Sequence, residues 1–166
     1  MTEDRSVVSE ATNADLDGVL ELQAENQIDR GGVLSASLSR SRVAAMMRDM
    51  PLIVARRGGL VTGFLMTTTK AMNADLPIVQ AMFAAYQGRS DAYVYDPICV
   101  GAEERGKGLA QAMFEELRAL EPGREGILFI RRDNEASLRA HTRMGMREVA
   151  EFRFNDFAFA VFSYIG

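Results

Sequence analysis

The segment Val100-Gly-Ala-Glu-Glu-Arg-Gly-Lys-Gly-Leu-Ala joins two regular elements and contains three glycines and two cations. Residues 92–100 are rich in β-branched and aromatic side chains and predict a buried strand. Residues 109–120 predict an amphipathic helix. Glycines at such a strand-to-helix turn let several backbone N–H groups converge on one anion near the helix N-terminus. Arg105 and Lys107 add positive charge, so the segment predicts a phosphate-binding loop.

Three kinds of phosphate-binding loop have related glycine patterns. A Walker A loop needs Ser or Thr directly after its lysine, but Lys107 lies between two glycines, which excludes this loop. The dinucleotide fingerprint G-x-G-x-x-G starts at Gly106 but has Gln111 in place of its last glycine. The third pattern, R/Q-x-x-G-x-G/A, is matched by Arg105, Gly108 and Ala110. A structural glycine turn without a ligand explains the same residues.

Outward from this loop, the chain predicts hairpin strands followed by a β-α-β unit, which is typical of an α/β fold with a mixed sheet. Residues 51–66 hold two apolar segments around Gly58-Gly59, the signature of a hairpin. Residues 126–130 predict a strand, and Asn134 can cap a helix that ends at Gly145. The other expected elements are a strand at 6–11, a helix from Thr12 or Asn13 to Gly31-Gly32 with Leu16, Val19, Leu20 and Ile28 inward, a helix at 37–49 with Val43, Met46 and Met47 inward, a short helix or ordered loop at 76–87, the helix at 109–120 with Leu109, Met113, Leu117 and Leu120 inward, and strands at 146–153 and 157–164.

The composition is that of an ordinary globular protein. The chain has 166 residues, of which 48% are hydrophobic and 25% charged, and we expect one domain over residues 1–166 that buries its core without a disulfide or structural metal. Cys99 is the one cysteine, and a single cysteine with a single histidine cannot form a zinc site of the Cys/His kind. The sequence has neither a signal-peptide pattern at its start nor an apolar run of membrane-spanning length. We therefore expect a cytoplasmic protein that does not bind membranes.

The charge distribution points to an anionic ligand. The net charge of −4 argues against non-specific nucleic-acid binding, and we expect no nucleic-acid partner. From Arg105 to Arg147, nine Lys and Arg residues face six Asp and Glu residues, a local balance of +3 that leaves −7 for the rest of the chain. Uneven charge on solvated faces would produce the same count.

Three segments, in this order, resemble the GNAT superfamily of N-acetyltransferases, and the resemblance covers nearly the whole chain. Gly59-Leu-Val-Thr-Gly-Phe-Leu resembles the second and third strands of that family. Tyr95-Asp-Pro-Ile-Cys-Val, followed by Arg105-Gly-Lys-Gly-Leu-Ala, resembles its fourth strand and pyrophosphate loop. Asn134-Glu-Ala-Ser-Leu-Arg-Ala-His-Thr-Arg-Met-Gly-Met resembles the next helix, N-x-x-(A/S)-x-x-x-(Y/H)-x-x-x-G-F. The resemblance implies a mixed, mostly antiparallel sheet of about seven strands, flanked by helices, with the fourth and fifth strands splayed apart.

The resemblance implies acetyl-CoA or another acyl-CoA as co-substrate, without a metal. The expected reaction is direct transfer of the acyl group to a primary amine of a small molecule or peptide. A β-bulge in the fourth strand exposes backbone groups that can pair with the pantetheine arm. The implied CoA-binding residues are Ile98, Cys99 and Val100 on that strand, Arg105, Gly106, Lys107, Gly108, Leu109 and Ala110 in the loop, and Asn134, Ser137 and His141 on the later helix.

The resemblance also suggests catalytic residues, each with an ordinary structural alternative. His141 stands where the family commonly has a tyrosine that protonates the departing thiolate, and a histidine can donate a proton near neutral pH. His141 could instead only contact CoA or pack on the sheet. Asp96 and Glu25 are the acidic candidates for the base, although Asp96 also suits a turn and Glu25 a solvated helix face. Cys99 is not expected to act as a nucleophile, because it lies in an apolar strand without a paired base.

Two other functions stay open at this stage. The chain could bind CoA without catalysis, as an interaction module, or it could use the same loop for ATP or NAD. The identity of the amine and the oligomeric state, a homodimer included, are not fixed by the sequence.

Overall fold

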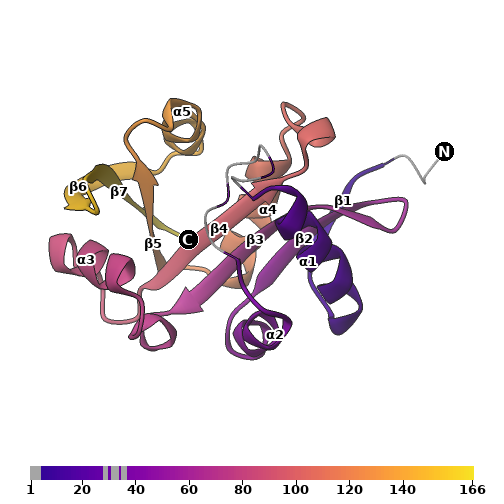
Figure 1. The fold of residues 1–166 in the computed structure, drawn as a ribbon, viewed down its shortest axis with the longest axis horizontal. Helices are drawn as coiled ribbons and strands as arrows, with labels where there is room; N and C mark the ends of the chain where they lie inside the picture. Colours follow the sequence, from indigo (N-terminus) through magenta and orange to yellow (C-terminus); the bar gives the residue numbers. More distant parts are fainter. Residues whose placement is uncertain (1–4, 28–29, 31–33, 35–36) are drawn as a thin grey trace. The chain divides into compact units, whose positions relative to one another are not determined.

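A computed structural model describes residues 5–27, 30, 34 and 37–166 of the chain (Figure 1). The strands are β1 (Val7–Glu10), β2 (Leu52–Arg57), β3 (Leu60–Thr69), β4 (Tyr93–Val100), β5 (Glu125–Arg131), β6 (Arg147–Phe154) and β7 (Phe157–Ile165). The helices are α1 (Leu16–Glu25), α2 (Arg40–Asp49), α3 (Pro77–Ala85), α4 (Leu109–Leu120) and α5 (Glu135–Arg143). Short 3₁₀ turns cover Asn13–Asp15, Ala71–Asn73 and Ala102–Glu104.

The strands form one mixed sheet. The seven strands follow the order β1-β2-β3-β4-β5-β7-β6. The pairs β1–β2, β2–β3, β5–β7 and β6–β7 are antiparallel, and β4 is parallel to β5. The parallel pairing joins Tyr93 to Gly126 and Val94 to Ile127, at the start of β4, in agreement with the expected splay. The predicted sheet is therefore confirmed.

The chain divides into two compact units. Unit 1 comprises Met1–Thr67 and Asp96–Leu120, and unit 2 comprises Thr68–Tyr95 and Glu121–Gly166. Strand β4 passes from unit 2 to unit 1 between Tyr95 and Asp96. The single domain expected over residues 1–166 stays a prediction.

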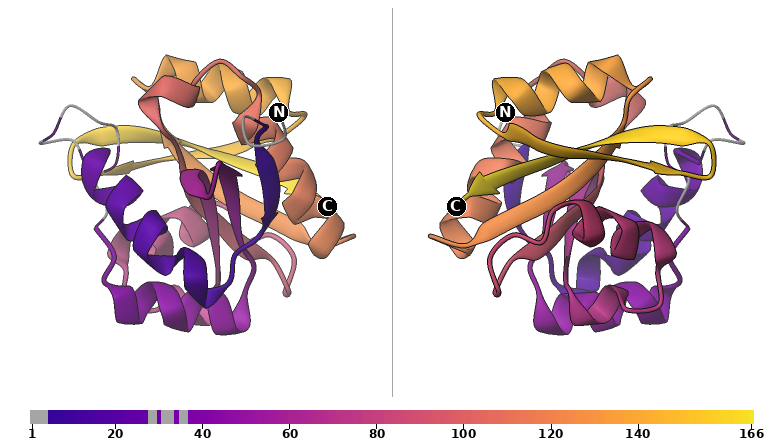
Figure 2. Two further views of the ribbon diagram at one scale, coloured as in Figure 1. Left: turned by 90° about the vertical axis from the view of Figure 1, so that its right-hand side faces the viewer. Right: turned by 90° about the vertical axis from the view of Figure 1, so that its left-hand side faces the viewer.

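In unit 1, α1 and α4 lie on opposite faces of the β1–β3 part of the sheet (Figure 2). Helix α4 has the predicted bounds, and its apolar stripe faces inward because its residues repeat at helical spacing. The stripe differs from the prediction at two places. Phe114 is buried, whereas Leu120, the last residue of the helix, is 38% exposed.

Helix α1 is shorter than the sequence predicts. It ends at Glu25, so the expected end at Gly31-Gly32 was wrong; these two glycines and Ile28 lie outside the described residues. Asn26 forms the C-cap, and its side-chain amide donates to the Leu22 carbonyl at 2.9 Å. The last carbonyl groups of a helix have no N–H partner inside it, and a side chain that donates to one of them can end the helix. Asn26 does this for α1, before the glycines that were expected to end it.

In unit 2, α3 and α5 lie on opposite faces of the β5–β7 part of the sheet (Figure 2). Because side chains alternate along a strand, neighbouring residues of β4 face different helices. Val94 packs in an apolar cluster with Val79 and Met82 of α3. Tyr93 and Tyr95 belong to the opposite face, where they contact Tyr164 of β7.

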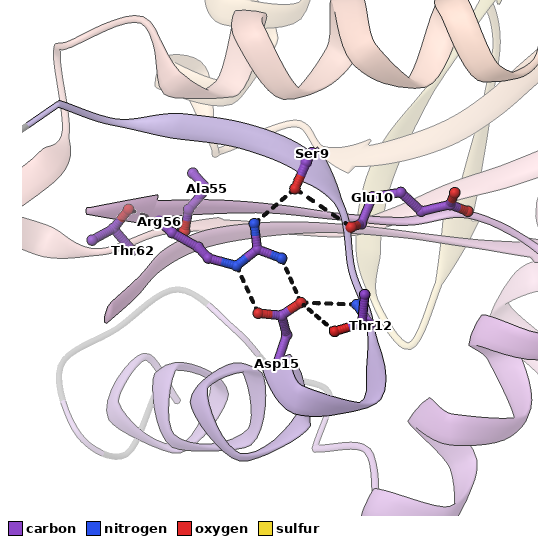
Figure 3. A network of polar contacts seen from close by, with 7 residues as sticks. All are labelled: Ser9, Glu10, Thr12, Asp15, Ala55, Arg56 and Thr62. Atoms are coloured by element: carbon purple, nitrogen blue, oxygen red, sulfur yellow. Dashed lines mark hydrogen bonds and ion pairs between the residues drawn. The ribbon is translucent and has the colours of Figure 1, made fainter. Parts of the chain in front are cut away.

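A partly buried ion pair ties the segment around Asp15 to β2 in unit 1 (Figure 3). Arg56 donates from Nε to Asp15 Oδ1 at 2.7 Å and from Nη1 to Ser9 Oγ at 2.7 Å. The Thr12 N–H donates to Asp15 Oδ2 at 2.8 Å. The carboxylate is therefore satisfied from two sides, and the network is structural.

We expect Asp15→Asn to destabilise the fold at neutral pH and much less in acid. The hydrogen bond from Arg56 lowers the pKa of Asp15 against the opposing effect of burial. A carboxyl with a depressed folded-state pKa contributes stability above its unfolded pKa of about 3.9 and loses it as the pH falls through the folded value. Urea unfolding should show a loss of about 1–3 kcal/mol at pH 7 that shrinks toward pH 2.

The matched control is Asp17→Asn, because Asp17 is exposed and pairs with the exposed Arg40. It should cost well under 1 kcal/mol at either pH, on the order of 0.5 kcal/mol. An Asp15→Asn loss that is the same at both pH values would contradict the role assigned to the ion pair.

Candidate functional site

The glycine loop of unit 1 has the open, tightly turned backbone that the sequence predicts. Gly106 and Gly108 both have φ of 79°, in the left-handed region that favours glycine. No heavy atom lies within 4 Å of the position that a Cβ would take on either residue. Residues 105–108 are exposed. The loop therefore presents backbone, without side-chain cover, to its surroundings.

The N-terminus of α4 adds donors to this loop. The first bond of the helix runs from Ala112 N to Gly108 O at 3.0 Å. The N–H groups of Leu109, Ala110 and Gln111 consequently have no acceptor inside the helix. Together with the positive end of the helix dipole, such N–H groups bind anions. The residues present thus fit a diphosphate.

The Arg105 side chain is held by its own unit. Its Nη2 donates to Asn26 Oδ1 at 3.3 Å, and its Nε donates to the Val100 carbonyl at 3.4 Å. Arg105 therefore connects the loop to the end of α1 and the end of β4. The arrangement gives the loop a structural support as well as a charge.

Glu104 fixes the loop to the sheet, and it is not among the residues that the sequence predicts for the site. Its side chain is buried and forms ion pairs with Arg57 of β2 and, at 3.4 Å, with Lys107. The carboxylate offsets part of the Lys107 charge and fixes the loop to the sheet. A carboxylate directly before the Arg-Gly-Lys-Gly segment was the available sequence signal.

The second half of β4 leads into the loop. Cys99 is buried, while Ile98 and Val100 are half-buried. The N–H that follows, on Gly101, donates to the Thr62 carbonyl at 2.8 Å. Burial raises the pKa of the Cys99 thiol to about 11, with Arg105 acting in the opposite direction, so the thiol is protonated at neutral pH. This supports the expectation that Cys99 is no nucleophile.

The two acidic candidates also belong to unit 1. Asp96 is half-buried on β4, and burial raises its pKa to about 7. Glu25 is exposed at the end of α1, next to the Asn26 that receives the Arg105 bond. No hydrogen bond or ion pair joins Asp96 to Glu25 in the described part of the chain.

Unit 2 holds the candidates of α5. Asn134 caps this helix as predicted, because its side-chain oxygen accepts from the Ser137 N–H at 3.2 Å. His141 is buried in the last turn. Its Nδ1 lies 2.8 Å from the Ser137 carbonyl oxygen, and its Nε2 lies 3.2 Å from the Tyr95 hydroxyl. Burial lowers the pKa of His141, while the backbone bond to Ser137 acts against it.

The structure thus groups the predicted residues by unit. The fourth-strand and loop residues occur with Asp96 and Glu25 in unit 1, where Glu104 and Asn26 join them. Ser137 and His141 occur in unit 2, where Tyr95 joins them. The described residues contain no cluster of three or more His, Cys, Asp and Glu side chains suited to a metal ion.

Comparison with known proteins identifies the fold. No family model matches the sequence, and no curated protein does. Solved structures match over almost the full length. A GNAT-family acetyltransferase from Streptococcus agalactiae has 14% identity and a TM-score of 0.73, covering 97% of this chain and 95% of its own.

Two further structures match over similar shares of the chain, with slightly lower TM-scores. The ribosomal-protein-S18-alanine N-acetyltransferase from Escherichia coli has 14% identity and a TM-score of 0.69 over 97% of this chain and 94% of its own. The protein yncA from Salmonella typhimurium, solved with its cofactor acetyl-CoA, has 16% identity and a TM-score of 0.70 over the same shares. The chain therefore has the fold of the GNAT acetyltransferases, as the sequence resemblance predicts. Among the described helices, none has the length and apolar character needed to cross a membrane.

Proposed function

We propose that the protein is an acyl-CoA-dependent N-acyltransferase that transfers acetyl to a primary amine of a small molecule or peptide. The observation that carries this proposal is the glycine loop, whose positive-φ backbone and helix N–H groups without an acceptor inside the helix suit a diphosphate. The GNAT fold supports it, and so does the similar Salmonella protein that was solved with acetyl-CoA.

Each unit would contribute binding groups of its own. CoA supplies, when bound, an acyl group activated as a thioester. The backbone of residues 105–110 would hold the diphosphate, and the backbone of residues 98–100 would pair with the pantetheine amides. Asn134, Ser137 and His141 are the proposed contacts from unit 2. Arg105 and Glu104 would keep the loop in its binding conformation through their bonds to Asn26 and Arg57.

Two observations bear on the class of the acceptor. The similar Escherichia coli protein is named for the alanine of ribosomal protein S18, which favours a peptide amine. The net charge of −4 would steer a cationic amine toward the protein. A protonated amine cannot attack a thioester, so the reaction needs a proton acceptor. Asp96, with its pKa of about 7, and Glu25 are the carboxylate candidates.

The test is release of free CoA thiol from acetyl-CoA in the presence of amino acids, polyamines, aminoglycosides and peptides with free N-termini. We expect thiol release that depends on one class of amine, together with a mass increase of one acetyl group on that amine. Binding of CoA without release for any amine would identify a silent CoA-binding module instead. Calorimetric competition in which ATP or NAD displaces CoA would favour the nucleotide-binding alternative.

A further inference from the structure

Strand β6 forms an edge of the sheet. Among the described strands its one neighbour is β7, and β1 forms the other edge (Figure 1). An edge strand presents backbone N–H and C=O groups that can pair with another chain. The pairing of β6 with β7 shifts register between Glu148 and Ala150, so the regular part of this edge comprises residues 150–154.

The hairpin turn fixes which backbone groups of β6 point away from β7. The two residues that join β6 to β7 have φ of 48° and 69°, as in a type I′ turn. Such a turn has a hydrogen bond between its outer residues, here Phe154 and Phe157, and hydrogen-bonded pairs alternate along an antiparallel ladder. Phe154 and Phe152 therefore direct their backbone groups to β7, whereas Arg153 and Glu151 direct theirs to the open edge.

The side chains of this edge are complementary to themselves. Glu151 and Arg153 are exposed and lie on the same face of the sheet, because they are two residues apart. In an antiparallel pair of two β6 strands with Phe152 opposite its own copy, Glu151 lies opposite Arg153 of the second copy, twice. Opposite charges directly across from each other stabilise an antiparallel pair. On the other face, Ala150 lies opposite Phe154 of the second copy.

The backbone and the side chains favour the same register. The outward backbone groups of Glu151 and Arg153 become the hydrogen-bonded pairs of this arrangement, and Phe152 becomes the closer, non-hydrogen-bonded pair on the twofold axis. Phe152 is half-buried and stacks on Phe159, with centroids 5.1 Å apart, and it meets Phe129 edge to face. The Phe152 ring of a second copy would extend this aromatic cluster, and cross-strand aromatic pairs are stabilising.

The other edge of the sheet lacks this complementarity. Strand β1 has one charged residue, Glu10, so no antiparallel register of β1 with itself places an opposite charge across from that carboxylate. Ser9 of β1 already accepts a hydrogen bond from Arg56 at 2.7 Å. The charge pattern therefore favours β6 as the edge that pairs with a second copy.

We propose that the chain forms a twofold-symmetric dimer in which β6 of one copy pairs antiparallel with β6 of the other, centred on Phe152. The interface is isologous, because each contact occurs twice about the axis. It continues the sheet of unit 2 from one copy into the next, by the strand addition that many proteins use for recognition. All of its residues belong to unit 2, and it does not depend on the proposed acyltransferase function.

Sedimentation equilibrium of the full chain measures the dimer, and we expect the wild type to associate reversibly. Arg153→Glu places carboxylates across from each other at both ends of the interface, and Glu151→Arg places guanidinium groups there. Each variant alone should dimerise at least roughly 10-fold more weakly than the wild type. An equimolar mixture should associate like the wild type, because every Glu of one variant then faces an Arg of the other. Recovery in the mixture also shows that both variants are folded.

Arg139→Glu is the matched control, since Arg139 is an exposed arginine of α5 in the same unit. This charge reversal should leave the dimer unchanged. A wild type that stays monomeric at the highest soluble concentration overturns the proposal. A dimer that both β6 variants leave intact also overturns it, because the copies then associate through another surface.

Disulfide cross-linking tests the register. Phe152→Cys places two cysteines in a non-hydrogen-bonded pair, whose Cα atoms lie about 4.5 Å apart, within the range of a disulfide. We expect oxidation to link two Phe152→Cys chains, and to link Ala150→Cys to Phe154→Cys but not to itself. The wild type should not link, because its one cysteine, Cys99, is buried. Self-linking of Ala150→Cys, with Phe152→Cys unlinked, would overturn the pairing centred on Phe152.

Discussion

Gly108→Glu should abolish measurable binding of CoA while the protein stays folded. The substituted side chain would place a carboxylate where the backbone N–H groups meet the open surface of the loop. It would repel the diphosphate and occupy its space. Isothermal calorimetry should show affinity weaker by at least roughly 100-fold, which corresponds to about 2.7 kcal/mol.

The matched control is Gly59→Glu in the turn between β2 and β3. Gly59 has the same φ of 79°, and it too has no heavy atom within 4 Å of a Cβ position. The two variants therefore share the left-handed strain, on the order of 1–2 kcal/mol, and the added charge. Loss of CoA binding in both variants to the same degree would show that strain or charge, and not the loop, is responsible.

Gly126→Ala should clearly destabilise unit 2. Gly126 lies in β5, and a Cβ there would overlap the Tyr164 ring. That ring cannot move aside easily, because it is buried, bonded to the Tyr93 hydroxyl and packed against Tyr95. Overpacking of this kind costs about 1–3 kcal/mol. Chemical unfolding of the variant measures the loss.

A double variant identifies the cause of that loss. If the overlap with Tyr164 is responsible, Gly126→Ala combined with Tyr164→Leu should lose less than the sum of the two single changes. Strict additivity of the two changes would contradict the packing explanation.

Local patterns in the sequence predict most of the regular structure. Residues 109–120 form α4 with the expected bounds, because an apolar stripe at helical spacing and a glycine turn agree on where the helix begins. Asn134 caps α5 as expected, since Asn favours N-caps through its own side chain. The end of α1 was predicted wrongly because the side-chain bond of Asn26 ends the helix before the glycines.

Long-range contacts explain what the sequence does not reveal about the candidate site. The Tyr95–His141 bond joins residues 46 positions apart, and the Arg105–Asn26 bond joins residues 79 positions apart. Neither pairing leaves a periodic or local signal. The partners of both ring nitrogens of His141 come from the fold, and the proton-donor role that the resemblance implies stays a prediction.

Titration of ¹⁵N-labelled protein with CoA, followed through its backbone amide signals, is the most direct test of how the loop would bind the cofactor. We expect the largest shifts on the amides of Gly106, Gly108, Leu109 and Ala110, and we expect Gly108→Glu to remove them. Saturating shifts elsewhere, with these four amides unmoved, would contradict this expectation.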